Sequence, residues 1–246
     1  MSGKIKFILL STCVFLSIAN AQIPLNWEDP RVIGINKEPA HVTHIPYPSI
    51  KDALADTALV PRNTPYYQSL DGVWKFKWVK NPDNRPKDFY KSSYDVNGWA
   101  DIKVPGTWQM QGWGMPIYAN HPYPFIPEYQ KLNPPHIPHE NNPVGSYRRS
   151  FNVPENWANR EIYIHFDGVK SAFYIWVNGQ MVGYSQGSMT PAEFNITPYI
   201  KKGENILAVQ VYRWSDGSYL ENQDMWRFGG IFRGVYLYSL PPLHLE

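Results

Sequence analysis

A short stretch near the carboxyl end gathers acids, amides, an indole and a guanidinium. Residues 221–227 read Glu-Asn-Gln-Asp-Met-Trp-Arg. Carboxylates and amides form hydrogen bonds with hydroxyl groups, and an indole packs against an apolar ring face, so this set suits a sugar. The plainer interpretation is a surface loop held together by an ion pair between its own aspartate and arginine. Composition alone leaves both interpretations open.

The two acids of this stretch, Glu221 and Asp224, do not make a hydrolase by themselves. Glycoside hydrolysis needs two carboxyl groups at a defined separation in space, which distance along the sequence does not supply. The sequence has no glycine-rich phosphate loop and no His-Glu-x-x-His zinc motif. Residues 183–187 read Gly-Tyr-Ser-Gln-Gly, the spacing of a nucleophile elbow, but the strand-to-helix context of that motif is missing. The sequence therefore favours binding over catalysis in this stretch.

The rest of the chain alternates apolar and polar residues in short runs. Trp74, Phe76 and Trp78 share one face of residues 73–79 and lysines occupy the other, which predicts a half-buried strand. Six more runs predict strands: residues 147–153, 161–166, 172–177, 180–185, 206–212 and 230–238. In residues 147–153 Arg148 is expected to point outward and Arg149 inward, where it needs a partner.

The fold class follows from these strands and from the composition. Aromatic residues make up 15% of the chain, with 23 prolines and 17 glycines, which suits short strands joined by turns. Asn178 and Gly179 have the sequence of a type I′ hairpin turn. No β-α-β spacing is present, so a parallel sheet is not expected. We expect an all-β fold: an antiparallel two-sheet sandwich of the jelly-roll type over residues 66–240.

The amino terminus has a different character. Lys4 and Lys6 precede a short apolar run that ends in Ala-Asn-Ala at residue 21, which predicts a secretory signal peptide over residues 1–21 and a periplasmic or secreted protein. The run is too short to span a membrane. Cleavage removes Cys13, the one cysteine, and a lipid anchor on Cys13 is the alternative interpretation. The formal net charge of +2 gives no reason to expect nucleic acid binding.

Residues 22–65 are rich in proline and lack alternation, so we expect an extended arm that lies on the body, with one short helix capped by Ser49. Two further irregular segments, residues 108–142 and 213–228, interrupt the strands. Long structured loops on a rigid sandwich are where binding residues concentrate.

Several blocks of the sequence, in order along residues 25–240, resemble the sugar-binding domain of glycoside hydrolase family two, and within it the bacterial β-galactosidases. The blocks are residues 70–76, 104–112, 116–120, 142–148, 215–221, 223–227 and 230–233. The resemblance implies a galactose-binding-like jelly roll that packs against a (β/α)8 barrel. That barrel carries both catalytic glutamates of a retaining mechanism, so this chain alone is expected to be inactive.

The resemblance also implies where the rest of the protein begins. Residues 241–246 are expected to start a linker to the barrel, which is missing from this sequence. A homo-oligomer of the full-length protein is compatible with the resemblance. A stand-alone carbohydrate-binding module is the alternative, since that class also uses jelly rolls with aromatic platforms. β-Glucuronidase and β-mannosidase are sibling activities of the same family.

The family motifs assign two substrate contacts. Asp224 matches the aspartate that contacts galactose hydroxyls and helps to bind a sodium ion, and Asn120 matches an asparagine at a sugar hydroxyl. The resemblance places magnesium in the missing catalytic domain. His121 stands where many relatives carry a small apolar residue, so the leaving-group subsite is expected to differ.

The neighbouring aromatic and basic residues have less direct roles in this interpretation. Trp226 and Arg227 are expected to support Asp224 rather than to contact the sugar. Trp108 and Trp113 are candidates either for a stacking surface or for the core.

Overall fold

The structure is a computed structural model that describes residues 25–42, 44–58, 62–119, 123–126 and 131–244. The predicted signal peptide with Cys13 lies outside the described residues, as do Asn120 and His121. The predictions for these residues therefore stay predictions.

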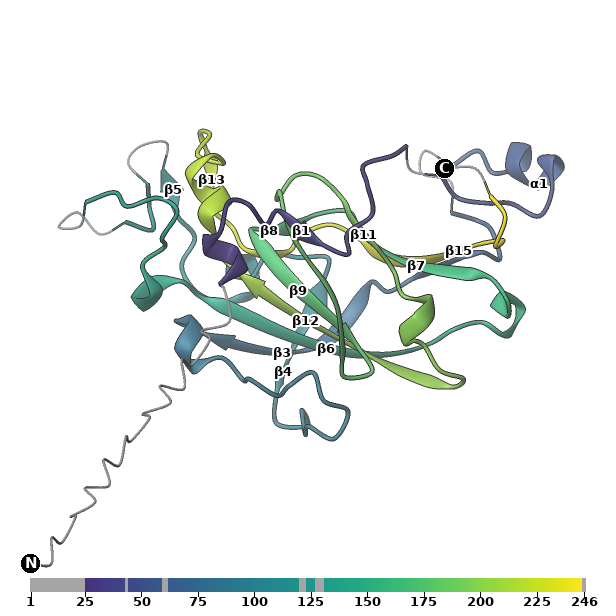
Figure 1. Cartoon of the computed structure of the whole chain (residues 1–246), viewed down its shortest axis with the longest axis horizontal. Helices are drawn as coiled ribbons and strands as arrows, with labels where there is room; N and C mark the ends of the chain where they lie inside the picture. The colour runs from purple at the N-terminus through teal and green to yellow at the C-terminus, as the bar shows by residue number, and fades with distance from the viewer. Residues whose placement is uncertain (1–24, 43, 59–61, 120–122, 127–130, 245–246) are drawn as a thin grey trace, which may run out of the picture.

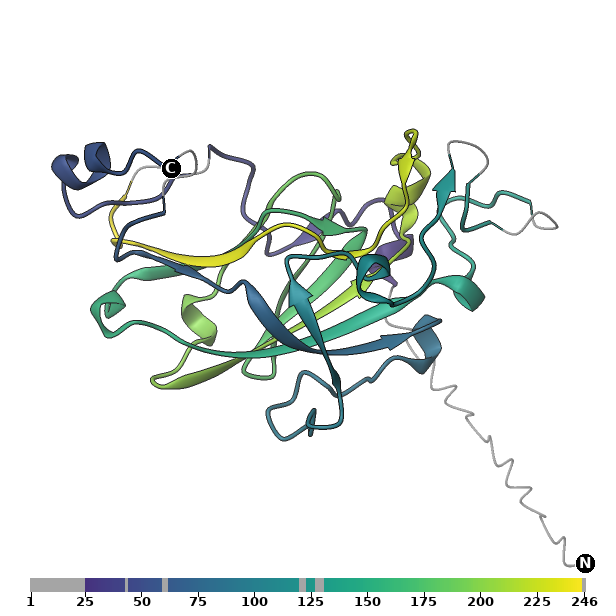
Figure 2. The same ribbon diagram turned by 180° about the vertical axis from the view of Figure 1, so that it is seen from behind.

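Two antiparallel sheets form the body of the molecule (Figures 1 and 2). The larger sheet has seven strands, in spatial order β1 (Gly34–Ile35), β10 (Gln180–Gln186), β9 (Ala172–Val177), β12 (Glu204–Tyr212), β6 (Val144–Asn152), β3 (Gly72–Val79) and β4 (Ala100–Val104). The smaller sheet has four, β11 (Ala192–Asn195), β7 (Glu161–Phe166), β15 (Val235–Leu240) and β2 (Tyr67–Ser69). Two short ladders pair β13 (Met225–Trp226) with β5 (Tyr118–Ala119), and β14 (Gly230–Ile231) with β8 (Val169–Lys170). The predicted all-β antiparallel sandwich is confirmed.

Helical structure is sparse in the described part of the chain. One α-helix, α1 (Ile50–Ala55), begins at the predicted cap, where the Ser49 hydroxyl accepts a hydrogen bond from the Asp52 amide at 3.1 Å. Seven single 3-10 turns complete the chain: Asn26–Glu28, Pro82–Asn84, Gln109–Gln111, His139–Asn141, Glu155–Trp157, Thr197–Tyr199 and Asp216–Tyr219. None of the helices described has the length and apolar character that a membrane crossing requires.

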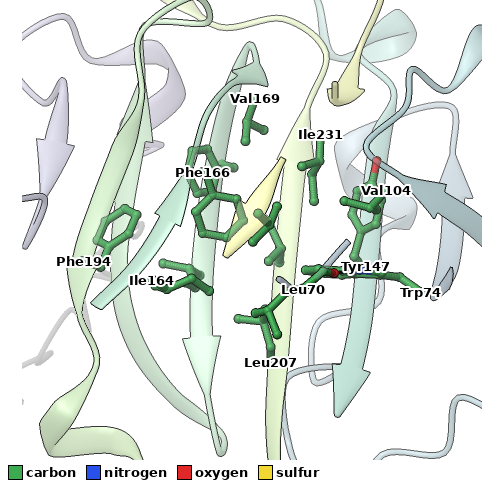
Figure 3. Packing of buried hydrophobic residues seen from close by; sticks show 14 of the residues in the cluster. Leu70, Trp74, Val104, Tyr147, Ile164, Phe166, Val169, Phe194, Leu207 and Ile231 are labelled. Atoms are coloured by element: carbon green, nitrogen blue, oxygen red, sulfur yellow. Dashed lines mark hydrogen bonds between the residues drawn. The ribbon is translucent and has the colours of Figure 1, made fainter. Parts of the chain in front are cut away.

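The core lies between the two sheets. Figure 3 shows Ile164, Phe166 and Phe194 of the smaller sheet directed toward Tyr147 and Leu207 of the larger one. All five side chains are fully buried. Each such side chain contributes about 1.5–3 kcal/mol by leaving water, so the facing layers hold the sandwich together.

The N-terminal segment lies against this body. Trp27 is 1% exposed and stacks on Tyr212 with 5.1 Å between ring centroids. Strand β1 extends the larger sheet by pairing with β10, Gly34 opposite Ser185. The sheet thus acquires its outermost strand, only two residues long, from the proline-rich segment that was predicted to be an extended arm.

Three sequence-based expectations need correction or detail. Arg149 points inward and finds main-chain partners, the carbonyls of Leu70 and Asp71. Arg148 lies on the outward face as predicted, beside Lys75, but it is 6% exposed because it donates to the carbonyls of Phe89 and Lys91 on a covering loop. The strand predicted over residues 230–238 is broken into β14 and β15.

Candidate functional site

The two irregular segments of the sequence meet in one small antiparallel ladder. Met225 pairs with Ala119 and Trp226 with Tyr118, although more than a hundred residues separate the two strands. Figures 1 and 2 both place β5 and β13 at the end of the sandwich away from α1. Asp224 directly precedes β13, whereas Asn120, which follows β5 in the sequence, lies outside the described residues.

The structure separates the roles of the two acids in this loop. Glu221 accepts hydrogen bonds from the main-chain amide of Ser188 at 2.8 Å and from its hydroxyl at 2.5 Å. Both carboxylate oxygens of Glu221 are therefore engaged in holding two loops together. Asp224 is exposed, and its carboxylate raises the pKa of Tyr118 through a side-chain hydrogen bond and its charge. Asp224 is the acid that remains accessible to a ligand.

Arg227 lies buried under the loop and holds it by hydrogen bonds to main-chain and side-chain oxygens. It is 1% exposed, and its Nε and Nη2 atoms donate to the Ala119 carbonyl at 3.1 and 2.7 Å. Further donors reach the carbonyls of Glu221 at 2.9 Å and Gln223 at 2.5 Å, and the side-chain oxygen of Asn222 at 3.0 Å. Burial lowers the pKa of this guanidinium, and the negative charge of Asp224 opposes the shift.

The alternative of a loop held by its own Asp–Arg ion pair is not what the described residues show. The salt bridges among them include none between Asp224 and Arg227. Arg227 instead binds oxygens that carry no formal charge. The Asp224 carboxylate thus has a hydrogen bond with Tyr118 but no ion pair with Arg227, and its exposed oxygens can accept further hydrogen bonds.

A second arginine supports the first. The Arg213 Nη2 atom donates to the Arg227 carbonyl at 2.7 Å and to the Met115 carbonyl at 3.1 Å. Arg213 is 4% exposed, and burial lowers its pKa to about 10. The Lys170 Nζ atom lies nearby, 3.4 Å from the Met225 sulfur, and burial lowers its pKa as well. Three buried cations thus lie under the Asp224 loop.

Aromatic rings flank Asp224 on the surface. Trp226 is 52% exposed and lies parallel to Phe228, with 5.7 Å between centroids and 4° between planes. Tyr118 is 56% exposed and its ring is 5.5 Å from that of Trp226. An exposed aromatic group beside a carboxylate offers both surfaces that a sugar presents, its hydroxyl edge and its apolar face.

The two other candidate tryptophans, Trp108 and Trp113, pack against the core. Trp108 is fully buried and packs against Phe76 at 6.1 Å, so core packing is its role. Trp113 is partly buried against the same core cluster. Trp108 therefore offers no stacking surface, whereas Trp113 packs against the core and keeps part of its side chain exposed.

A cavity of about 900 Å3 lies beside the loop, between the N-terminal arm and the turn that precedes Glu221. Its described lining residues include Ile33, Gln186, Asp216 and Glu221 but not Asp224. The candidate site is therefore an exposed corner of the sandwich rather than part of this cavity.

The Gly-Tyr-Ser-Gln-Gly sequence at residues 183–187 is not a nucleophile elbow. Ser185 is 2% exposed and lies inside strand β10.

The metal-binding capacity of the described residues is small. They contain no cluster of three His, Cys, Asp or Glu side chains with the arrangement of a metal site. The Asp224 carboxylate is one hard oxygen donor, the kind of ligand that hard cations prefer.

Sequence reasoning located Asp224 and Arg227 but missed Tyr118 and Arg213 as members of the site. Tyr118 stood inside a quoted family block, yet its contact with the Asp224 loop depends on a strand pairing between distant segments. The partners of Arg213 are main-chain carbonyls, which leave no mark in the side-chain sequence.

Comparison with known proteins agrees with this architecture. Residues 67–241 match the family described as glycosyl hydrolases family 2, sugar binding domain. The chain is 46% identical over 217 residues to a β-galactosidase of Priestia megaterium, and 47% identical over 222 residues to one of Halalkalibacterium halodurans. These alignments cover 88% and 90% of this chain but only 21% of either relative. The chain thus spans about a fifth of the length of these β-galactosidases.

Solved structures share the fold. β-Glucuronidase 2 of Bacteroides uniformis, covalently bound to cyclophellitol-6-carboxylate aziridine, is 27% identical with a TM-score of 0.53, over 71% of this chain and 18% of that one. A β-glycosidase of Bacteroides vulgatus is 25% identical with a TM-score of 0.51, over 72% and 20%. With the domain match covering most of the described sandwich, the chain belongs to glycosyl hydrolases family 2, and residues 67–241 are its sugar-binding domain.

Proposed function

We propose that this chain is the N-terminal sugar-binding part of a β-galactosidase, in which Asp224 holds hydroxyl groups of a terminal β-galactose. The identity of 46–47% to two β-galactosidases over about nine tenths of the chain supports this substrate. The observation that carries the proposal is the contrast between the two loop acids. Glu221 is bound by Ser188, whereas Asp224 is exposed next to exposed aromatic rings.

The chemistry of bond cleavage belongs, in this proposal, to polypeptide beyond this sequence. A (β/α)8 barrel supplies the two catalytic glutamates of a retaining hydrolase, and its magnesium lies with them. Asp224 would supply one carboxylate oxygen to a sodium ion whose other ligands would come from that barrel. Asn120 contributes a further sugar contact. The whole protein is exported through residues 1–21 and works in the periplasm or outside the cell, with room for a homo-oligomer.

One observation favours a second candidate, a stand-alone carbohydrate-binding module. Trp226 and Tyr118 are both about half exposed and lie against each other, as an aromatic platform does. A free module has to bind its glycan unaided, which means a Kd below about 0.1 mM, or roughly −5.5 kcal/mol. A part of a larger pocket binds more weakly, because most of the contacts are absent.

Binding measurements on the 246-residue chain test the proposal. Methyl β-galactoside and methyl β-glucuronide are titrated separately, with saturation-transfer NMR as the readout. We expect weak binding of the galactoside that Asp224→Asn abolishes and that the control Asp83→Asn, an exposed acid in the 3-10 turn Pro82–Asn84, leaves intact. Equal galactoside binding by the two variants would remove Asp224 from the site. Preference for the glucuronide would reassign the substrate.

A further inference from the structure

Two buried arginines, Arg213 and Arg227, make hydrogen bonds that connect residues 115–119 with residues 221–227, the loop that carries Asp224. They are 4% and 1% exposed. A buried charge is costly unless its N–H groups are hydrogen-bonded. Among the described residues Arg227 makes these bonds through all three nitrogens, and Arg213 makes them through Nη2 while its Nε has no hydrogen-bond partner. The acceptors are uncharged oxygens, chiefly main-chain carbonyls. They therefore fix the course of the backbone rather than neutralise an acid.

The contacts of Arg227 bear directly on Asp224. Its Nη2 atom lies 2.5 Å from the Gln223 carbonyl oxygen, which belongs to the peptide unit that enters Asp224. The same nitrogen lies 2.7 Å from the Ala119 carbonyl on strand β5. The Arg227 amide donates to the Ile117 carbonyl at 2.7 Å. One residue thus holds the main chain next to Asp224 at a set distance from the facing strand.

Arg213 connects the same two segments through carbonyl oxygens of its own. Its Nη2 atom bridges the Arg227 carbonyl, at 2.7 Å, and the Met115 carbonyl, at 3.1 Å. Met115 opens the segment that leads into β5, so both arginines join the same two stretches of chain. Neither stretch has a long strand that could hold it, since β5 and β13 have two residues each.

We propose that Arg213 and Arg227 form an arginine clamp that ties residues 115–119 to residues 221–227 and thereby positions Asp224 for the sugar. Arg227 acts as a positioning residue, not as a sugar ligand. The planar guanidinium is essential, because Arg227 uses N–H groups on three nitrogens to reach four oxygens at once, and the three donors on the single nitrogen of a lysine cannot satisfy that set. This inference rests on the proposed sugar site, but its structural part can be tested without sugar.

The first test is hydrogen exchange on the 246-residue chain. In Arg227→Lys, which keeps the charge, we expect amides in residues 117–119 and in residues 221–227 to exchange at least about tenfold faster together, since bonds to a charged donor are lost. The matched control is Arg149→Lys, because Arg149 also binds two carbonyls but contacts neither segment. Faster exchange in one segment only, or in neither, would overturn the clamp.

The second test is chemical rescue of binding. In Arg227→Ala we expect methyl β-galactoside affinity to fall at least about tenfold and to recover when methylguanidinium is added, because a free guanidinium can reoccupy the same carbonyls. A general loss of packing would not respond to methylguanidinium, so no recovery in a folded variant would overturn the clamp. If the alanine variant does not fold, the exchange result for the lysine variant decides.

The failures of the two proposals are distinguishable. Normal exchange and normal galactoside affinity in Arg227→Lys, with affinity lost in Asp224→Asn, would refute the clamp and keep the sugar site. Coupled loosening of both segments in a chain that binds no galactoside would support the clamp as a backbone device and refute the proposed function.

Discussion

The outer face of the smaller sheet carries a buried ionic network centred on His165. This side chain is 3% exposed, with Nδ1 2.6 Å from Glu193 Oε2 and Nε2 3.2 Å from Asp167 Oδ1. Two residues of the N-terminal arm join the same carboxylates: His41 Nε2 lies 2.9 Å from Glu193, and Arg62 Nη2 lies 3.3 Å from Asp167. The network therefore fastens the arm to the sandwich.

The protonation of His165 sets the pH range in which this network stabilises the fold. Burial acts to lower the pKa of His165, but hydrogen bonds to Asp167 and Glu193 outweigh it and raise the pKa above its ordinary value of 6.5. Burial acts to raise the pKa of Glu193 and of Asp167, and the hydrogen bonds from His165 lower both below their ordinary 4.5 and 3.8. Tyr236, stacked on the imidazole at 4.5 Å, and Tyr238, whose hydroxyl donates to Glu193, complete the surroundings.

The histidine and the two acids stabilise the fold over different pH ranges. The contribution of His165 is complete below pH 6.5 and is lost as the pH rises through its raised pKa. The contributions of the two acids are present above 4.5 and 3.8 and are lost as the pH falls through their lowered values. The network stabilises the protein most between about pH 4.5 and 6.5.

The perturbation is His165→Gln, followed by urea unfolding at pH 5.5 and 8.5. Removing one partner of a buried ion pair costs about 3–5 kcal/mol, so we expect that loss at pH 5.5. At pH 8.5 the loss should be smaller, by about 1.4 kcal/mol for each tenfold difference in proton affinity between folded and unfolded His165. The control His136→Gln removes a 64% exposed side chain 3.8 Å from Glu28, and should cost about 0–1 kcal/mol. A loss that is the same at both pH values would refute the reasoning.

Three further predictions concern packing, capping and stacking. Gly145→Ala should lower the free energy of unfolding by about 1–3 kcal/mol or more in urea, because the added Cβ would lie 2.5 Å from the Trp108 ring; an unchanged midpoint would contradict this. Ser49→Ala should destabilise α1 by about 1 kcal/mol in local hydrogen exchange but leave the global transition unchanged, because α1 buries no residue; a shifted global midpoint would contradict it. Trp226→Ala should weaken galactoside binding by about 1 kcal/mol without changing the unfolding curve, since the ring is 52% exposed; unaltered affinity would exclude stacking.

The sequence predicted best those elements that local signals define. The bounds of β7 and β9 match the predicted strands at both ends, because alternation is clean and turns flank each run. Asn178 and Gly179 have positive φ angles of 52° and 85°, as the type I′ turn requires.

Distant partners explain what the sequence did not predict. The break between β14 and β15 places the Val235 amide where it donates to Asp71 Oδ1 at 2.9 Å, a residue 164 positions earlier. Arg148 is buried because a loop around Phe89 covers its face of the sheet. Neither contact has a counterpart in the local sequence pattern.

In the candidate site, too, the local sequence predicted some features and distant contacts determined the others. Residue types identified the stretch 221–227 as suited to a sugar, and the family resemblance selected Asp224 within it. The difference between Asp224 and Glu221 emerged only from the contact of Glu221 with Ser188, which lies on another loop. The roles of Tyr118 and Arg213 likewise depend on the pairing of β5 with β13 and on carbonyl contacts.

The most direct test of the account is the kinetics of Asp224→Ala in a polypeptide that joins this domain to the catalytic barrel proposed above. Hydrogen bonds to sugar hydroxyls that strengthen in the transition state supply several kcal/mol, so kcat/KM for a chromogenic β-galactoside should fall by about two to four orders of magnitude. The matched variant Asp83→Ala should retain full activity. A value for Asp224→Ala within about threefold of the unaltered protein, less than 1 kcal/mol, would contradict the account.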